Sequence, residues 1–260
     1  MTQIRGFLVA LQQAALDALR GRRGLVLLLI SLVPMLIAFF ADGDRSGLRN
    51  FVYHNLVLNV AFQFVIPFCA LLLGASVLGD ELEGRTITYL FTRPVDRGLI
   101  YLGRLFGTGI AFSVLLAITL SAALHLRPVL NAPPWLDPFG TVKLAVGVFW
   151  VYLAIFAGVR TILKRALLVG MLYILVLDLF ISHMVYIGLA QFSIWHHVAV
   201  IYTEDFERTY RGLRFLRQAI PEGAAASESV RFLAVAFGLA AFLGAWFTRT
   251  REYPVAGAVA

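Results

Sequence analysis

The feature that most constrains this chain is a series of apolar runs, each close to the length that crosses a lipid bilayer. A membrane-spanning helix needs about 20 mainly apolar residues. Hydrophobic residues make up 60% of the 260 residues and charged residues only 14%, whereas a soluble domain has about 45–50% and about 25%. This composition excludes a disordered chain, a coiled coil and an ordinary soluble globule. The sequence therefore predicts a polytopic membrane protein.

Six apolar runs are candidates for transmembrane helices, so we expect an all-α fold in which residues 1–260 form a single transmembrane domain. The six expected spans cover residues 24–40, 56–79, 99–124, 142–159, 166–189 and 232–247. We interpret the first run as a retained helix and not as a cleaved signal peptide. About twenty residues precede it, which is long for the n-region of a signal peptide, and no small-x-small cleavage site follows.

The distribution of basic residues predicts how these spans are oriented. With the N-terminus in the cytoplasm, 13 of the 22 Lys and Arg residues fall in cytoplasmic segments, against four in the first two outer loops and five in the last. Cytoplasmic loops of membrane proteins carry an excess of Lys and Arg, so we expect both termini in the cytoplasm. The net charge of +7 indicates contact with anionic membrane lipid. No aromatic–basic pattern typical of a nucleic-acid-binding surface is present.

Residues 1–23 precede the first span and are predicted to form an amphipathic helix. Apolar residues recur along one side at helical spacing, and polar residues face the other way. The apolar stripe comprises Ile4, Phe7, Leu8, Leu11, Ala15 and Leu19. Such a helix is suited to lie in the membrane interface, although the same pattern is typical of a helix packed on the bundle. Both interpretations stay open.

The segment at 80–98, between the second and third spans, is the most informative part of the sequence. Its first turn is acidic, which the helix dipole favours, and apolar residues then recur at i, i+3, i+4. The acids are Asp80, Glu81 and Glu83, and the apolar residues are Ile87, Leu90 and Phe91. Pro94 ends the helix, because the residue before a proline avoids the helical region. We expect a short cytoplasmic helix with an apolar docking face or, alternatively, a solvated loop.

Individual residues in this part of the chain form a recognisable pattern. A pair of acids is followed by a threonine, a leucine and an Arg-Pro-Val-x-Arg block: Glu81, Glu83, Thr86, Leu90, Arg93, Pro94, Val95 and Arg97. Gly103 and Arg104 follow in the third span. The stretch from about Phe64 to Gly107 thereby resembles the permease subunits of ABC transporters of the bacterial ABC-2 (type V exporter) kind. Arg85 departs from the family pattern, because it occupies a position that is usually glycine.

This resemblance implies that the segment at 80–98 is a coupling helix, which seats in a groove of a separate ATP-binding subunit. The implied coupling residues are Glu81, Glu83, Arg85, Thr86, Leu90, Arg93, Pro94 and Arg97. It also implies an exporter in a bacterial inner membrane, built from two permease chains, identical or different, and two ATPase chains. The sequence has no Gly-x-x-x-x-Gly-Lys-Ser/Thr loop. ATP-Mg is therefore expected in the partner subunit, and no cofactor in this chain.

Polar residues within or beside the expected spans raise other possibilities. Asp178 lies in the middle of the fifth span, where a carboxylate costs about 2.5–3.5 kcal/mol on insertion scales, and His183 follows five residues later. Asp178 could pair with a neighbouring helix or across a dimer, line a transport path, or take part in a proton relay or catalysis. His196 and His197 with nearby acids could bind a metal. Adjacent histidines rarely point the same way, so we expect no metal site.

Two further patterns concern helix packing and the last outer loop. Gly103 and Gly107 form a pair of small residues that permits close helix approach, and we favour packing within the chain over a dimer contact. In the loop at 190–229, Thr203 is expected to cap a helix over 203–219, because acids fill the turn that follows. That helix would lie on the membrane, cover an exit path or form a lid over the bundle.

The leading interpretation is therefore a transport subunit and not an enzyme. Two other classes of protein stay open. The first is a membrane-embedded enzyme that uses Asp178, His183 or the outer histidines, although the sequence offers no nucleophile–base pair or cofactor loop typical of such an enzyme. The second is a non-catalytic membrane assembly protein whose basic loops contact lipid.

Overall fold

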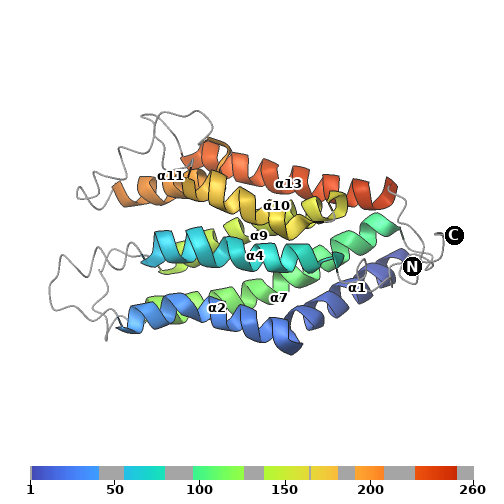
Figure 1. The fold of residues 1–260 in the computed structure, drawn as a ribbon, viewed down its shortest axis with the longest axis horizontal. Coiled ribbons are helices and arrows are strands. Elements are labelled where there is room, and N and C mark those ends of the chain that lie inside the picture. Colours follow the sequence, from blue (N-terminus) through green and yellow to red (C-terminus); the bar gives the residue numbers. More distant parts are fainter. Residues whose placement is uncertain are drawn as a thin grey trace.

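The structure is a computed structural model, and it describes residues 2–40, 56–79, 96–125, 138–163, 165–180, 191–207 and 226–250. Within these ranges the chain is largely helical and contains no strand. The helices are α1 (Thr2–Leu19), α2 (Gly21–Phe40), η1 (Leu56–Val65), α4 (Ile66–Ser76), α7 (Arg97–His125), α9 (Pro138–Ile162), α10 (Ala166–Tyr173), η2 (Ile174–Phe180), α11 (Ile194–Glu207) and α13 (Ala226–Thr250). Most of them run side by side along the long axis of the molecule (Figure 1).

All six apolar runs form helices where the structure describes them. Three helical stretches are long and apolar enough to cross a membrane: Arg97–Leu124, Phe139–Ile162 and Ala226–Thr250. Shorter apolar helices accompany them at Arg23–Ile37, Val60–Ser76 and Ala166–Phe180. The prediction of an all-α fold is therefore confirmed for the described residues, and the three long apolar helices are consistent with a multi-pass membrane protein.

The two ends of the helix bundle carry different elements. Gln3 in α1 and Arg249 in α13 lie at the same end, where both contact Asp96, the residue before α7. Figure 1 shows this end on the right, and we call it the proximal end. The opposite end, which we call the distal end, carries the last turns of α2 and helix α11 (Figure 1).

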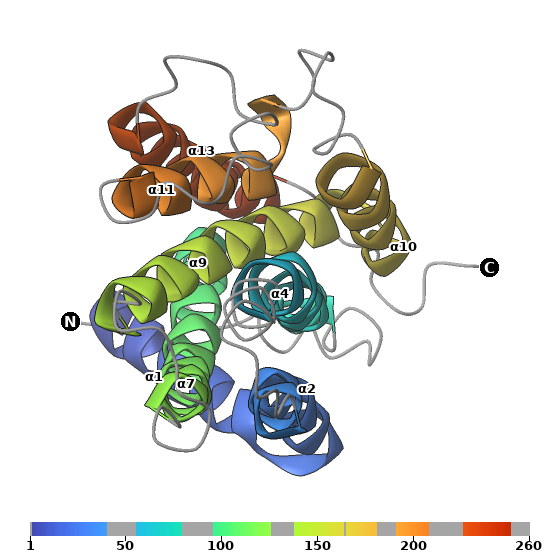
Figure 2. The same cartoon turned by 90° about the vertical axis from the view of Figure 1, so that its left-hand side faces the viewer.

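Helix α9 forms the centre of the bundle, because it packs against α4, α7 and α13 (Figure 2). Its apolar stretch is 56% buried, whereas that of α13 is only 17% buried, so most of α13 faces outward. Phe149, Tyr152 and Phe156 on α9 are at most 1% exposed. The close approach of α4 depends on Gly74, where a Cβ atom would lie 2.8 Å from the Cβ atom of Phe156.

Helix α1 packs along the proximal half of α7. The small residues Ala10, Ala14 and Ala18 form its buried side. Opposite them, a Cβ atom at Gly103 would lie 2.9 Å from the carbonyl oxygen of Phe7, and one at Gly107 would collide with the backbone of α1. The prediction that these glycines pack within the chain is confirmed. Larger apolar residues of α1 stay exposed, namely Ile4, Leu8, Leu16 and Leu19.

Two of the apolar runs contain π-helical segments, in which each turn holds an extra residue. In the second run, η1 gives way to α4 beside Pro67, which has no N–H to donate within a helix. In the fifth run, η2 follows α10 and contains Asp178. The apolar pattern alone did not indicate either segment, because π and α helices both bury apolar runs.

The helix expected over 203–219 begins earlier than predicted. Helix α11 starts at Ile194, so Thr203 lies inside it and the prediction of an N-cap at Thr203 is wrong. Ser193 precedes the first helical residue, and its Oγ accepts a hydrogen bond from the backbone N–H of His196 at 3.4 Å. That bond is typical of a serine N-cap. Residues 208–219 lie outside the described residues.

Candidate functional site

The proximal end contains both junctions of the expected coupling segment, at Gly79 and Asp96. Most of the coupling residues named above lie outside the described residues: Glu81, Glu83, Arg85, Thr86, Leu90, Arg93 and Pro94. Arg97 is described and begins α7. The described parts of this site are therefore its two junctions. At the first the segment leaves α4, and at the second it enters α7.

The junction after α4 is held by two arginines from other helices. Arg104 on α7 donates from Nη1 to the carbonyl oxygen of Val77 at 3.0 Å, and this arginine is only 9% exposed. Arg160, in the last turn of α9, donates from Nη2 to the carbonyl oxygen of Gly79 at 3.5 Å. Carbonyl groups at the end of a helix lack partners within it and carry partial negative charge, so both contacts are favourable.

The junction before α7 is held by Asp96. Its backbone N–H donates to Oε1 of Gln3 at 3.0 Å, and its Oδ1 accepts the N–H of Gly98 at 2.8 Å. Its Oδ2 lies 3.4 Å from Nε of Arg249. A single residue thus connects α1, the first turn of α7 and the last turn of α13. Asp96 was not among the residues predicted from the sequence, although an aspartate directly before a helix is itself an N-cap signal.

Together, the two junctions connect the expected coupling segment to four helices besides α4. Arg104 of α7 and Arg160 of α9 bind the backbone carbonyl groups that follow α4. Gln3 of α1 and Arg249 of α13 bind Asp96. A displacement of the segment would therefore act on the whole proximal end and not on one helix alone.

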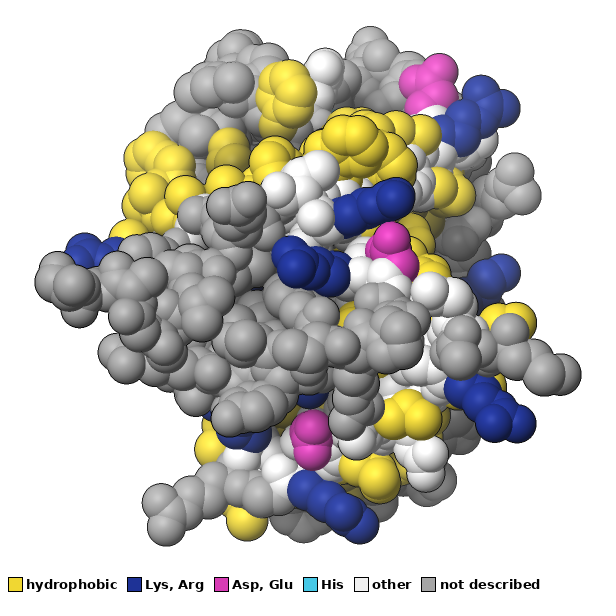
Figure 3. All heavy atoms as spheres, turned by 90° about the vertical axis from the view of Figure 1, so that its right-hand side faces the viewer, with side chains coloured by type: hydrophobic (Ala, Val, Ile, Leu, Met, Phe, Trp, Pro, Cys, Tyr) yellow, Lys and Arg dark blue, Asp and Glu magenta, His cyan; other side chains and the backbone are white. Residues whose placement is uncertain are grey.

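The described part of the proximal end is rich in arginine. Its described arginines are Arg5, Arg20, Arg23, Arg97, Arg104, Arg160, Arg165 and Arg249. Figure 3, which faces this end, shows several Lys or Arg side chains distributed over it. In the described part of the distal end, by contrast, the basic residues are Lys143 and Arg231.

The intramembrane candidate Asp178 is fully buried and lies among hydrogen-bond donors from other elements. Its Oδ2 accepts the hydroxyl of Tyr152 on α9 at 2.7 Å, and its Oδ1 accepts the hydroxyl of Ser193 at 2.7 Å. The backbone N–H groups of Ile194 and Trp195 also donate to this carboxylate. Asp178 therefore binds the N-terminus of α11, where the helix dipole favours a negative group.

The backbone carbonyl group of Asp178 also accepts a hydrogen bond from another helix. Nε2 of Gln63, in η1, donates to the carbonyl oxygen of Asp178 at 3.1 Å. The Asp178 cluster, formed by Asp178, Tyr152, Ser193 and Gln63, thus joins the second, fourth and fifth apolar runs to α11. The other intramembrane candidate, His183, lies outside the described residues.

The two adjacent histidines at the start of α11 differ in their surroundings. His197 stacks on Phe232 of α13, with ring centroids 4.0 Å apart. Its Nε2 donates to the carbonyl oxygen of Gln191 at 2.8 Å, and its Nδ1 lies 3.1 Å from Oγ of Ser229. Burial lowers the pKa of His197, and burial together with His197 lowers that of His196. Both ring nitrogens of His197 are thus used in contacts within the chain. Among the described residues no three His, Cys, Asp or Glu side chains form a metal-binding group.

Comparison with known proteins identifies the family. Residues 11–246 match the family described as ABC-2 family transporter protein. The chain belongs to the ABC-2 family. Its sequence is also similar to the probable ABC transporter permease protein NosY of Pseudomonas aeruginosa, with 32% identity over 131 residues. That alignment covers 48% of each protein, so the chain matches about half the length of this relative.

Membership of the ABC-2 family confirms the resemblance inferred from the residues between Phe64 and Gly107. It supports a transport role for this chain, in place of the alternative of a catalytic enzyme. The proximal junctions at Gly79 and Asp96 are then the part of the ABC-2 permease that lies nearest to the expected coupling segment.

Proposed function

We propose that this chain is a six-span permease subunit of an ATP-driven exporter. It works as a dimer, with an identical or a different permease chain, and with separate subunits that bind ATP-Mg. The complex lies in a bacterial inner membrane with both permease termini in the cytoplasm. Helix α1 lies against the cytoplasmic interface through its exposed apolar residues, as expected for an interfacial helix.

The orientation is supported by the charge at the proximal end. That end contains both Gln3 and Arg249, and eight of the described arginines lie there. Cytoplasmic segments of membrane proteins are enriched in Lys and Arg. The proximal end therefore faces the cytoplasm, where an ATP-binding subunit is located.

The observation that carries the coupling role is that both junctions of the segment at 80–98 are bonded to other helices. If ATP-driven closure of the ATPase pair displaces the coupling helix, the displacement reaches α7 and α9 through Arg104 and Arg160. It reaches α1 and α13 through Asp96. Packed helices respond to such a displacement by moving as rigid elements, which opens an outward path between the two permease chains.

The test is affinity purification of the intact complex from native membranes, followed by mass spectrometry and an ATPase assay. We expect a stoichiometric partner with a phosphate-binding loop. The double reversal Glu81→Arg and Glu83→Arg should remove that partner or its coupled ATPase activity, while the permease stays folded. The matched control is Glu204→Arg with Glu207→Arg, which reverses two acids in the distal part of the chain and should change neither.

Two results would contradict the proposal. Normal coupling in the Glu81 and Glu83 reversal would exclude the segment at 80–98 as the coupling element. Absence of any ATP-binding partner from the intact complex would instead favour the alternative of a non-catalytic assembly protein.

A further inference from the structure

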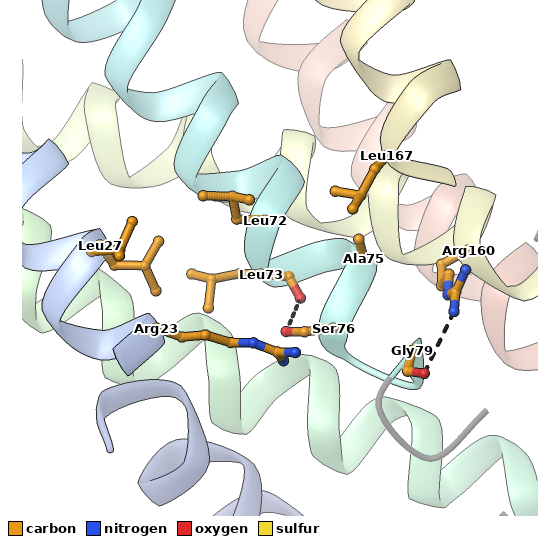
Figure 4. A pocket seen from close by; sticks show the side chains of 10 residues that line it. Arg23, Leu27, Leu72, Leu73, Ala75, Ser76, Gly79, Arg160 and Leu167 are labelled. Carbon is orange, nitrogen blue, oxygen red and sulfur yellow. Dashed lines mark hydrogen bonds between the residues drawn. The ribbon is translucent and has the colours of Figure 1, made fainter. Parts of the chain in front are cut away.

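A cavity of about 280 Å³ opens near the proximal end between α2, α4, α9 and α10. Its described lining is mostly apolar, with two arginines and a serine. The lining residues are Arg23, Val26, Leu27, Leu72, Leu73, Ala75, Ser76, Gly79, Arg160 and Leu167. Figure 4 shows Arg23 of α2 and Arg160 of α9 on opposite sides of the cavity, with Ser76 between them. None of the ten lining residues is acidic, so the cavity fits an anionic group and not a cation.

The cavity continues into a second hollow deeper along the bundle. That hollow has a volume of about 520 Å³ and shares Leu72 and Leu167 with the first. All its lining residues are apolar: Ile30, Val33, Val60, Phe64, Val65, Phe68, Leu71, Leu72, Leu167 and Met171. The two hollows adjoin at Leu72 and Leu167, and together we call them the α2–α4 groove. It has a basic mouth at the proximal end and an apolar channel beyond.

The walls of this groove open to the outside of the bundle. Leu72, Leu167 and Met171 are 40%, 51% and 47% exposed, although all three are large and apolar. Exposed apolar side chains at this depth are stable in contact with acyl chains. A free inorganic anion would fit the mouth but would leave the longer apolar part of the groove without a suitable occupant.

We propose that the α2–α4 groove binds one anionic phospholipid. Its phosphate lies between the guanidinium groups of Arg23 and Arg160, and an acyl chain extends past Leu72 and Leu167 toward Phe64. A guanidinium carries five N–H donors in a geometry suited to phosphate. Hydrogen bonds from Arg160 to Gly79 and to a phosphate are therefore compatible. Basic pockets between transmembrane helices are a known form of headgroup site.

The position of the groove also predicts an effect of bound lipid on transport. This effect rests on the function proposed above. Gly79 lines the mouth and is the last described residue before the coupling segment. A phosphate held by Arg160 lies beside the contact between Arg160 and Gly79. Bound lipid therefore stabilises the junction after α4, and the coupled ATPase activity rises with anionic lipid. Lipid binding itself does not require that function and is tested separately.

The binding test uses the full chain purified in detergent and native mass spectrometry with phosphatidylglycerol or phosphatidylcholine as the probe. We expect one phosphatidylglycerol per chain and weaker retention of phosphatidylcholine. Arg23→Gln should weaken phosphatidylglycerol binding about fivefold, the effect expected for one arginine near an anionic headgroup. The matched control Arg20→Gln removes the same charge from an exposed residue three positions earlier, outside the cavity lining, and should leave binding unchanged.

Two further variants test separately the binding of the lipid headgroup and the binding of its acyl chain. Leu167→Trp fills the point where the two hollows join and should abolish retention without changing any charge. Arg160→Lys keeps a positive charge at the mouth and should preserve most of the binding, which guards against a simple folding defect at the junction after α4. Arg23 and Leu167 are exposed, so substitution there should not unfold the chain.

Several outcomes would overturn the proposal. Equal lipid retention by Arg23→Gln and Arg20→Gln would show that the mouth does not select the headgroup. Displacement of phosphatidylglycerol by inorganic phosphate alone would identify a free-anion site. Cross-linking of cysteine placed at Met171 to the same position in another chain, regardless of lipid, would show that a second copy of the permease fills the groove. Loss of anionic-lipid stimulation of the ATPase with binding intact would contradict only the link to transport.

Discussion

The Asp96 carboxylate lies 3.4 Å from Nε of Arg249, which bonds the residue before α7 to the last turn of α13. The side chain of Arg249 is 68% exposed and that of Asp96 is 34% exposed. An ion pair this accessible contributes at most about 1 kcal/mol to folding stability. The other contacts of Asp96, with Gly98 and Gln3, connect backbone to side chain and do not depend on the charge of Arg249.

The first prediction compares the exposed ion pair between Asp96 and Arg249 with the hydrogen bond that Asp96 accepts from Gly98. Asp96→Ala removes the acceptor for the Gly98 N–H and should destabilise the protein by about 1 kcal/mol, as loss of an N-cap does. Arg249→Gln should cost less, because only the exposed ion pair is lost. Thermal unfolding in detergent measures both, and Asp96→Asn, which keeps an acceptor, is the control. A larger loss from Arg249→Gln than from Asp96→Ala would contradict the assignment.

The Asp178 cluster gives a second prediction. Asp178→Leu keeps the volume but leaves the hydroxyls of Tyr152 and Ser193 without their buried acceptor. The expected loss of stability is about 3 kcal/mol or more, since each unsatisfied buried group costs about 1–3 kcal/mol. Tyr152→Phe removes one donor only and should cost about 1 kcal/mol. Normal thermal stability of Asp178→Leu together with loss of transport would indicate a role in the transport path instead.

The contact between α1 and α7 gives a third prediction. Gly107→Ala places a methyl group against the backbone of Leu11 and should destabilise the protein by about 1–3 kcal/mol through overpacking. Gly238 on α13 is the matched control, because a Cβ atom there meets nothing within 4 Å. Gly238→Ala should be neutral or stabilising, as alanine favours helix. Equal thermal stability of the two variants would show that α1 does not pack on α7 in the membrane.

The fourth prediction concerns pH at the contact between α11 and α13. Burial lowers the pKa of His197 in the folded protein below its ordinary value of 6.5, so the unfolded chain takes up a proton at higher pH than the folded chain. Stability from neutral His197 is therefore present above pH 6.5 and falls as the pH decreases below it. Hydrogen exchange of α11, compared with the intrinsic exchange rate of unfolded amides at each pH, should show smaller protection factors at pH 5.5 than at pH 8 in the parent.

His197→Gln is the comparison for that experiment. Gln keeps a donor for the Gln191 carbonyl but does not titrate, so the protection factors of α11 in this variant should be the same at the two pH values. Loss of protection at low pH in the variant as well would assign the pH dependence to another group, such as His196, whose pKa is also lowered.

Much of the site depends on partners that are distant in the sequence. Asp96 was recognisable as a helix N-cap from its own neighbours, but its contact with Gln3 joins residues 93 positions apart. Asp178 was recognisable as an unusual intramembrane carboxylate, whereas its backbone bond to Gln63 crosses 115 positions. The start of α11 at Ile194 was missed for a related reason, because it depends on Ser193 and on a carboxylate from another helix.

The residue pattern alone predicts an all-α membrane protein, the positions of its apolar helices and the resemblance to the ABC-2 family. Those properties follow from local composition, since lipid requires long apolar helices that satisfy their own backbone hydrogen bonds. Only the packed structure shows that Arg104, Arg160 and Asp96 hold the two junctions of the segment at 80–98. It also decided that Arg23 and Arg160 share one cavity. These side chains come from helices that approach each other only after packing, and helix packing depends on the shapes of facing surfaces, which no single run of sequence specifies.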